Sequence, residues 1–243
     1  MLPLFRKEFN GFLNSLIGYI VIIVFLLATG LFLWVFPIQM NLLDFGYASL
    51  DGLFTIAPFV FLFLIPAITM RSFADEKKSG TLELLMTQPL SDLQIILAKY
   101  LAGFVLVIFS LLPTLIYYFS VYRLGLPPGN LDSGGMWGSY TGLLFLGSAF
   151  VAIGIFSSSV TDNQIVSFVL AVVLSAFFYM GFELIYIFIL SGKVGLFIQS
   201  LGIQAHYSSM SRGVIDTRDV IYFFSITALF ILLTRLVLAA RKW

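Results

Sequence analysis

The sequence predicts an all-α membrane protein, and two observations carry that prediction: the excess of apolar residues and their arrangement in long runs. Hydrophobic residues make up 60% of the 243-residue chain and charged residues only 10%, with a mean hydropathy of +1.05. One soluble core cannot bury this much apolar surface, so lipid must cover the remainder. Six charge-poor runs are each long enough to cross a bilayer as a helix of about 20 residues. They cover residues 16–36, 52–70, 100–122, 138–157, 164–185 and 220–240.

Each run must be helical, because lipid offers no hydrogen-bond partner to the backbone and only helices or closed barrels satisfy it internally. The runs lack the alternation of apolar and polar residues that is typical of barrel strands. Six helices and their loops occupy the whole sequence. We therefore expect one membrane domain over residues 1–243, with no separate soluble domain.

The composition also excludes several kinds of chemistry. A formal net charge of +1 creates no long-range field for nucleic acid, and the absence of Cys removes disulfides and thiolate ligands. The Gly192-Lys193 pair is followed by Val194 instead of Ser or Thr, so the chain has no phosphate-binding loop. The sequence contains neither a His-Glu-x-x-His nor a Gly-x-Ser-x-Gly motif. We expect no catalytic residue, bound metal or cofactor in this chain.

Residues 1–14, which precede the first run, have one apolar and one polar face at helical spacing. Phe5, Phe9 and Phe12 recur every three or four residues, whereas Arg6 and Lys7 fill the other face. This pattern predicts an amphipathic helix that lies in the plane of the membrane interface. The alternative is that these residues extend the first span into the cytosol.

Six spans place both termini on one side of the membrane, and the basic residues indicate which side. Lys and Arg are more frequent in cytoplasmic loops than in outer loops. Only Arg123, Lys193, Arg212 and Arg218 lie outside if the termini are cytoplasmic. The inner side then holds nine of the 13 basic residues: Arg6, Lys7, Arg71, Lys77, Lys78, Lys99, Arg235, Arg241 and Lys242. We therefore expect both termini in the cytoplasm.

The loop over residues 71–98 concentrates more charge than any other stretch between spans. Gly80 can adopt a positive φ and so end one helix or open the next. Pro89 stops a short helix that starts after Gly80, because the residue before a proline is disfavoured in the α region. Ser91 and Gln94 form a capping-box pattern that predicts a new helix running into the third span. The alternative is an ordinary solvated loop.

The string from Asp75 to Leu85, Asp-Glu-Lys-Lys-Ser-Gly-Thr-Leu-Glu-Leu-Leu, followed by Pro89, resembles the loop after the second span of type-2 ABC transporter permeases. In that family the loop forms a coupling helix that docks in a groove of the cytosolic ATPase. The resemblance implies a type-2 ABC exporter fold and a cytosolic ABC ATPase dimer that binds the ATP. The coupling residues that it implies are Asp75, Glu76, Lys77, Lys78, Gly80, Thr81, Glu83, Leu84, Leu85 and Pro89.

The resemblance also implies a second permease subunit, either another copy of this chain or a related one. Six spans form only half of the usual pathway in the resembling family. Gly142, Gly147 and Gly154 in the fourth run permit the close approach of another helix. We therefore interpret these glycines as suited to a subunit contact.

A second string, from His206 to Phe223, resembles the segment before the sixth span in the gliding-motility-associated branch of these permeases. The copper-enzyme maturation permeases of nitrous oxide reduction are similar there too. The resemblance implies a bacterial inner-membrane protein that couples ATP hydrolysis to substrate export or to envelope work. A mechanical anchor without solute transport would need the same loop, and a secondary transporter or channel is a further alternative. The substrate stays open.

Residues 191–219 form an outer segment whose apolar stretch is too short to span the bilayer. A re-entrant or surface helix pair is expected there, in the place where related exporters have an outer gate; the alternative is a loop packed on the bundle.

Glu183 is either a functional intramembrane carboxylate or an interfacial one. His206 is assigned no ligand role, because metal sites need several converging donors. The outer-gate candidates are Glu183, Phe197, Leu201, Arg212 and Asp216.

Three serines and an acid follow the fourth run. Ser157, Ser158 and Ser159 can bond to free backbone groups where a helix ends, and Asp162 can cap the helix that follows. We interpret these residues as a structural boundary between the fourth and fifth spans.

Overall fold

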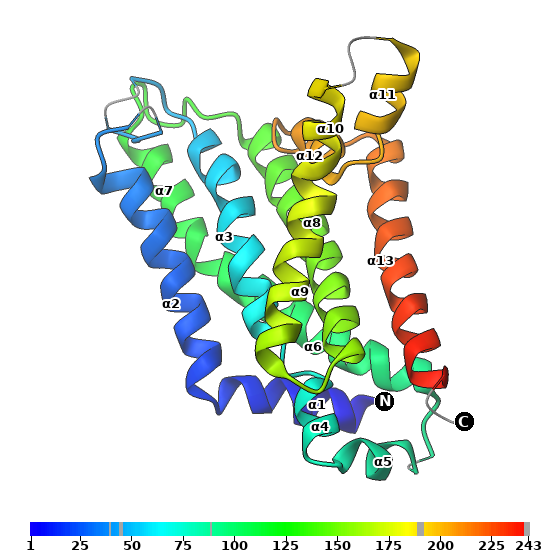
Figure 1. The fold of residues 1–243 in the computed structure, drawn as a ribbon. Coiled ribbons are helices and arrows are strands. Elements are labelled where there is room, and N and C mark those ends of the chain that lie inside the picture. Colours follow the sequence, from blue (N-terminus) through cyan, green and yellow to red (C-terminus); the bar gives the residue numbers. More distant parts are fainter. Residues whose placement is uncertain (39, 44–45, 88, 189–191, 241–243) are drawn as a thin grey trace.

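The protein is a bundle of helices with its first helix lying across one end (Figure 1). The computed structural model describes residues 1–38, 40–43, 46–87, 89–188 and 192–240, and every regular element in these ranges is helical. Six helices in this part of the chain are long and apolar enough to cross a membrane, which confirms the predicted fold class. They are Gly18–Val35, Asp51–Lys78, Asp92–Leu124, Ser133–Val160, Gln164–Phe188 and Thr217–Ala239. Arg241 and Lys242, which were counted for the orientation, lie outside the described residues, as does residue 191.

The first two helices meet at a sharp angle (Figure 1). Helix α1 (Leu2–Leu13) carries a proline in its first turn, where no helical N–H is lost, and ends at Asn14. Ser15 is extended and separates α1 from α2 (Leu16–Gly30), which continues into the π-helical turn η1 (Leu31–Val35). Extended backbone at Ser15 lets α1 turn across the bundle instead of extending the first span.

The second and third spans enclose the charged loop. Helix α3 (Asp51–Thr69) is followed by the short helices α4 (Ala74–Lys78) and α5 (Thr81–Met86). Helix α6 (Asp92–Leu111) begins with the predicted capping box, in which the Ser91 side chain accepts from the Gln94 N–H and the Gln94 side chain accepts from the Ser91 N–H. The 3₁₀ turn η2 (Leu112–Thr114) interrupts the span at Pro113 before α7 (Leu115–Leu124).

Helix α8 (Ser133–Val160) is the central element and packs on α3, α6, α9 and α13. Its glycines serve contacts within the chain, which corrects our interpretation of them as a subunit contact. A Cβ on Gly147 would lie 2.8 Å from Val107 Cγ1 of α6, and one on Gly154 would lie 2.0 Å from Thr69 Oγ1 of α3. Gly142 meets Met210 in the same way, at 2.7 Å. Small residues here let neighbouring helices of one subunit approach closely.

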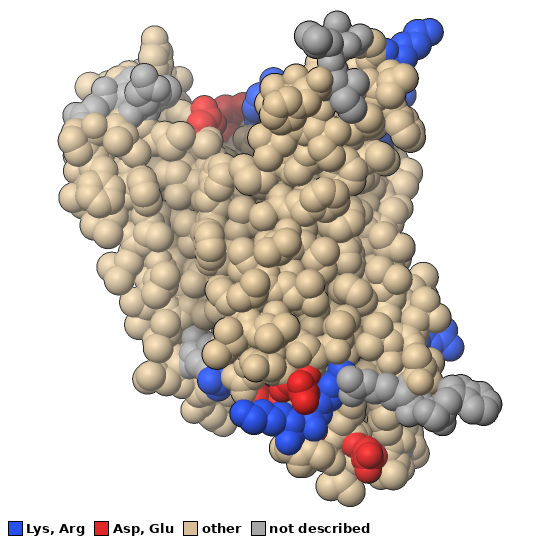
Figure 2. Space-filling view, viewed as in Figure 1, with Lys and Arg blue, Asp and Glu red and all other residues tan. Residues whose placement is uncertain are grey.

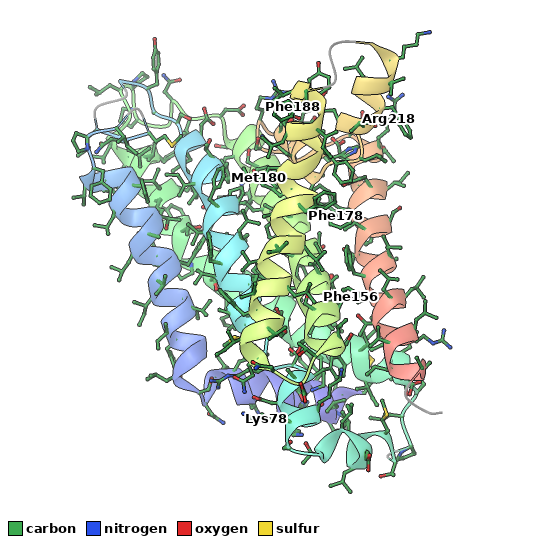
Figure 3. All side chains as sticks on the ribbon, in the orientation of Figure 1. Lys78, Phe156, Phe178, Met180, Phe188 and Arg218 are labelled. Atoms are coloured by element: carbon green, nitrogen blue, oxygen red, sulfur yellow. The ribbon has the colours of Figure 1, made fainter. Side chains whose placement is uncertain are left out.

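The fifth span begins with α9 (Gln164–Ala176), passes through the π-helical turn η3 (Phe177–Gly181) and ends as α10 (Phe182–Phe188). Two short helices follow, α11 (Lys193–Gln199) and α12 (Ile203–Met210), and then the last span, α13 (Thr217–Ala239). Phe156 of α8 and Phe178 of η3 both contact Phe230 of α13, at ring-centroid distances of 5.6 and 5.3 Å (Figure 3). This aromatic cluster joins the last three spans.

The two ends of the bundle differ in composition. One end, called here the charged end, holds α1, α4 and α5 and gathers basic and acidic side chains over these helices (Figure 2). The opposite end, called the distal end, holds α10, α11 and α12. Lys78 marks the charged end, whereas Phe188 and Arg218 lie at the distal end (Figure 3).

Candidate functional site

The loop between α3 and α6 folds into two short helices joined by a tight turn. Gly80 has a φ of +69°, in the left-handed region that glycine adopts without strain. The N–H of Ser79 donates to the carbonyl of Asp75, and the N–H of Gly80 donates to that of Lys77, which closes the end of α4. The turn lets α5 leave α4 in a new direction.

Helix α4 is capped by a serine from the C-terminal turn of α8. The N–H groups of Phe73 and Ala74 donate to Ser158 Oγ at 2.9 and 3.0 Å, and the same hydroxyl donates to the carbonyl of Met70 at 3.0 Å. Ser158 is fully buried and lies 85 residues from Phe73 in the sequence. Because unpaired buried N–H groups are costly, this hydroxyl fixes the position of α4 on α8.

Two further side chains of α4 point back to the bundle. The ammonium of Lys77 donates to the carbonyl of Ser159 at the end of α8. Gln164, at the start of α9, donates its amide N–H to Asp75 Oδ1. With Ser158, these contacts join α4 to the junction of the fourth and fifth spans.

A buried ion cluster holds three helices together at the charged end. Lys99 of α6 places its Nζ 3.0 Å from Glu8 Oε1 of α1 and 2.9 Å from Glu76 Oε1 of α4. The Lys99 side chain is 1% exposed and its Nζ lies 5.1 Å from the centre of the Phe73 ring. A lysine so buried needs opposite charges nearby, and the two carboxylates supply them. We call Glu8, Glu76 and Lys99 the ion triad.

Helix α5 has one buried face and one free face. Leu82 and Leu85 are buried and belong to the main hydrophobic core. Glu83 is exposed, and Leu84 is 68% exposed in spite of its apolar side chain. A short helix fixed on one side with an apolar residue on the other offers a defined surface to a partner.

The structure divides the ten predicted coupling residues between those that contact the bundle and those that are exposed. Asp75, Glu76 and Lys77 face the bundle, and Gly80 forms the turn. The hydroxyl of Thr81 lies 2.8 Å from that of Ser79. Leu85 is buried in the core. The residues exposed to the surroundings are Lys78, Gly80, Thr81, Glu83, Leu84 and Pro89.

The residues predicted to form the interfacial helix place their rings and their charges on different faces of α1. Phe5 stacks on Phe9 at a centroid distance of 5.9 Å, and Phe9 lies 5.7 Å from Phe109 of α6. Phe12 packs on a small apolar cluster with Val21, Ile68 and Leu106. Arg6 and Lys7 are exposed on the opposite face.

The distal end does not bring the five outer-gate candidates into one site. Glu183 of α10 accepts hydrogen bonds from Gln199 Nε2 of α11 at 2.9 and 3.3 Å. Phe197 is exposed. The carbonyl of Leu201 accepts from the Tyr222 hydroxyl at 2.6 Å. Arg212 donates to the carbonyl of Ser208, and Asp216 caps α13 through the N–H of Arg218.

The sole histidine connects the three last helices. Its Nδ1 lies 2.7 Å from Asp219 Oδ1 of α13, its Nε2 lies 2.9 Å from the carbonyl of Ser200 after α11, and its ring stacks on Tyr222 at 3.9 Å. His206 was expected to have no ligand role; the structure instead gives it a structural role. It bridges α11, α12 and α13.

Helix α12 is also anchored to the rest of the bundle. The Tyr207 hydroxyl donates to the carbonyl of Phe54 in α3 at 2.6 Å. Burial raises the pKa of the Tyr207 phenol well above its ordinary value, so the phenol keeps its proton and donates at any physiological pH. Gly213, with a φ of +82°, follows α12 so closely packed on α8 that a Cβ would lie 2.2 Å from Gly135 Cα. These contacts fix α12, while α11 depends on α10 and on the His206 bridge.

The expected boundary between the fourth and fifth spans needs two corrections. Helix α8 continues through Val160, so the three serines lie inside it, and Ser158 caps α4 instead of ending its own helix. The cap of α9 is Asn163, whose side chain accepts from the N–H groups of Ile165 and Val166, and Asp162 has no such role. A helix-capping pattern indicates a bond to free N–H groups but does not show to which helix those groups belong.

Sequence reasoning missed three residues of the site. In the sequence, Lys99 contributes only to the prediction of orientation, no pattern singles out Glu8, and Gln164 only marks the start of a span. The sequence offers one signal, which is Lys99 itself, a charged residue among the regularly spaced apolar residues of α6. A cation on the apolar face of a helix needs a partner, but the sequence does not name it.

Among the residues that the structure describes, no group of three or more His, Cys, Asp or Glu side chains could hold a metal ion. A search among curated proteins found no match to this sequence. A family profile described as "ABC-2 family transporter protein" matches residues 2–240, nearly the whole chain. Such a match agrees with six apolar helices and with the charged loop after the second. The chain therefore belongs to the ABC-2 transporter family, whose members are membrane subunits that work with an ABC ATPase.

Proposed function

We propose that this chain is the permease half of an ATP-driven exporter, in which α4 and α5 receive the motion of a separate cytosolic ATPase. ATP binding closes the ATPase dimer, α5 moves with it, and α4 passes the shift to the transmembrane helices. The chain binds no ATP itself in this proposal, and a second permease subunit completes the pathway.

One observation supports this proposal: α5 exposes Leu84 and Glu83, while α4, next to it, is joined to four other helices of the bundle. Ser158 joins α4 to α8, Gln164 joins it to α9, and Lys99 joins it to α6 and α1. A push on α5 would therefore reach four helices at once, since packed helices shift as units and do not deform continuously. A solvated loop would have no need for such contacts.

The orientation and the setting belong to the same proposal. The positive-inside count favours a cytoplasmic charged end in a bacterial inner membrane, with both termini inside. The distal helices α11 and α12 would then cover the outer mouth, with Glu183, Phe197, Leu201, Arg212 and Asp216 near it. The resemblance of residues 206–223 to gliding-motility-associated permeases favours export or mechanical work on the envelope.

The exposed leucine provides the test. Leu84→Arg removes the apolar contact and adds a charge on the free face of α5, so we expect co-purification of the ATPase to fall by about tenfold or more, equivalent to about 1.4 kcal/mol. Leu124→Arg is the matched control, because Leu124 is 64% exposed but lies at the distal end. Both variants should insert in the membrane at normal levels. If Leu84→Arg retains the ATPase as well as Leu124→Arg does, the proposed docking surface is wrong.

A further inference from the structure

The ion triad borders a cavity of about 260 Å³ at the junction of α1, α3, α4 and α6. Drug-sized ligands occupy cavities of about 300–1,000 Å³, so this one has room for a headgroup and not for a whole lipid. Its charged walls come from α1 (Lys7 and Glu8), the α3–α4 turn (Arg71), α4 (Asp75 and Glu76) and α6 (Lys99).

One atom in the cavity wall is left without a partner. Glu76 Oε1 is bound to Lys99, but Glu76 Oε2 is buried and has no hydrogen-bond partner within the described part of the chain. The ion triad carries two carboxylates and one ammonium, a formal charge of −1. A buried anionic oxygen without a donor is costly, so a cationic donor at this position would be stabilised.

Two further cations line the same cavity. Arg71 and Lys7 both line it, both are exposed, and neither forms an ion pair with a residue that the structure describes. The six charged residues of the wall sum to zero formal charge, three positive and three negative. Such a wall complements a zwitterion, with a cation against Glu76 and an anion against Arg71 and Lys7.

The position of the cavity indicates that its occupant comes from the membrane. Ile68, in the last turn of α3, and Phe12 of the amphipathic helix form its apolar wall. They belong to a small apolar cluster with Val21 and Leu106 that is separate from the main core. Span ends and an amphipathic helix meet at the level of the lipid headgroups.

We propose that this cavity binds the headgroup of phosphatidylethanolamine, with its ammonium on Glu76 Oε2 and its phosphate at Arg71 and Lys7. An ammonium donates three N–H groups and fits a single free carboxylate oxygen, whereas Mg²⁺ or Ca²⁺ requires six or more oxygen ligands. The headgroup would bind beside Lys99 and so touch α1, α4 and α6 together. Its presence would stiffen the connection between α4 and the membrane interface.

The test uses the detergent-purified full chain and native mass spectrometry with lipids of identical acyl chains. Phosphatidylethanolamine, its N,N-dimethyl derivative and phosphatidylcholine carry the same charges and differ in how many N–H donors are replaced by N-methyl groups, and phosphatidylglycerol lacks the cation. We expect phosphatidylethanolamine to bind about tenfold more tightly than phosphatidylcholine or phosphatidylglycerol, with the dimethyl lipid between them. Equal binding of phosphatidylethanolamine and phosphatidylcholine, or tighter binding of phosphatidylglycerol, would overturn the proposal without any variant.

Variants locate the site. Glu76→Gln keeps an oxygen for Lys99 but removes the charge, so the preference for phosphatidylethanolamine over phosphatidylcholine should fall to within about twofold. Asp162→Asn, at an exposed acid of the loop before α9, is the matched control and should keep the preference. Arg71→Gln should weaken both lipids equally, and Arg235→Gln, at an exposed arginine of α13, should not. A preference that survives Glu76→Gln would place the lipid elsewhere and refute the assignment.

Soluble glycerophosphoethanolamine distinguishes a membrane source from a free ligand. It keeps the ammonium and the singly charged phosphodiester but lacks acyl chains, so we expect it to displace bound phosphatidylethanolamine only at concentrations about a hundredfold higher, because the apolar wall contributes to lipid binding. Displacement at equal concentration would contradict the membrane source. The measurement needs no ATPase, so its failure would leave the proposed coupling function untouched.

Discussion

The charged end and the distal end of the bundle are built from contacts of very different range in the sequence. At the charged end Lys99 meets Glu8 across 91 residues, and Ser158 meets Phe73 across 85. At the distal end His206 meets Asp219 across 13 residues, and Glu183 meets Gln199 across 16. The charged end thus joins distant parts of the chain, whereas much of the distal end is held by its neighbours in sequence.

The range of these contacts indicates how motion would spread from each end. Long-range contacts at the charged end couple α1, α4, α6, α8 and α9, so they would move together. Helix α11 depends on α10 and on the His206 bridge, so it could open without disturbing the core. Helix α12, in contrast, is fixed to distant helices, by Tyr207 and by the close contact of Gly213 with α8. Elements with few long-range contacts open at lower free energy than the core.

The comparison of the two ends would be contradicted most directly if both ends lay on the same side of the membrane. Cysteines introduced at the exposed Ser79 and Ser208 test this in intact cells with an impermeant thiol reagent. We expect labelling at Ser208→Cys only, because the positive-inside rule places the charged end in the cytosol. The natural chain has no Cys and supplies an unlabelled background, while permeabilised membranes should label both variants. Labelling of Ser79→Cys from outside would exclude docking of α5 on a cytosolic ATPase.

Removing the centre of the ion triad should have the largest effect on stability. Lys99→Met deletes the buried cation and leaves Glu8 and Glu76 facing each other, so we expect the free energy of unfolding to fall by about 3 kcal/mol. Thermal unfolding of the purified chain in detergent measures it. Arg235→Met, at an exposed position of α13, is the control and should change stability by less than about 0.5 kcal/mol. A small loss for Lys99→Met would mean that the ion triad does not hold the charged end together.

Removing the cap of α4 should have the next largest effect on stability. Ser158→Ala removes the acceptor of two buried N–H groups, and we expect a loss of about 2 kcal/mol together with faster amide exchange in α4. Ser157→Ala is a matched control, because Ser157 is equally buried in the same helix but bonds only to the carbonyl of Ile153 one turn away. Equal effects of the two substitutions would show that the link between α8 and α4 is unimportant.

The smallest global effect is expected at the distal end. His206→Ala removes the bridge among α11, α12 and α13, and we expect about 1 kcal/mol or less of global destabilisation. Hydrogen exchange should nevertheless rise in α11, while α4 and α6 stay protected, because local opening does not require unfolding of the core. The comparison of the two ends would fail if exchange rose equally in α4.

Much of the fold could be predicted from the sequence, because its causes are local. Apolar runs must be helical in lipid, Gly80 suits a left-handed turn, and the Ser91 and Gln94 capping box starts α6 where expected. The site was less predictable. Asp75 and Lys77 belong to the coupling string, yet both point to the bundle, because the sequence shows that a residue is charged but not which way it faces.

The six spans, the amphipathic first helix and the short helix after Gly80 follow from the sequence alone, since period, propensity and capping act within a few residues. Only the tertiary structure decided the partners of Lys99 and Ser158 and the intramolecular use of the α8 glycines. It also decided that Glu76 keeps one free buried oxygen. A buried charge or hydroxyl requires a partner, but many different residues of the chain could form the required ion pair or hydrogen bond. Helix packing over some 90 residues of separation selects one of them.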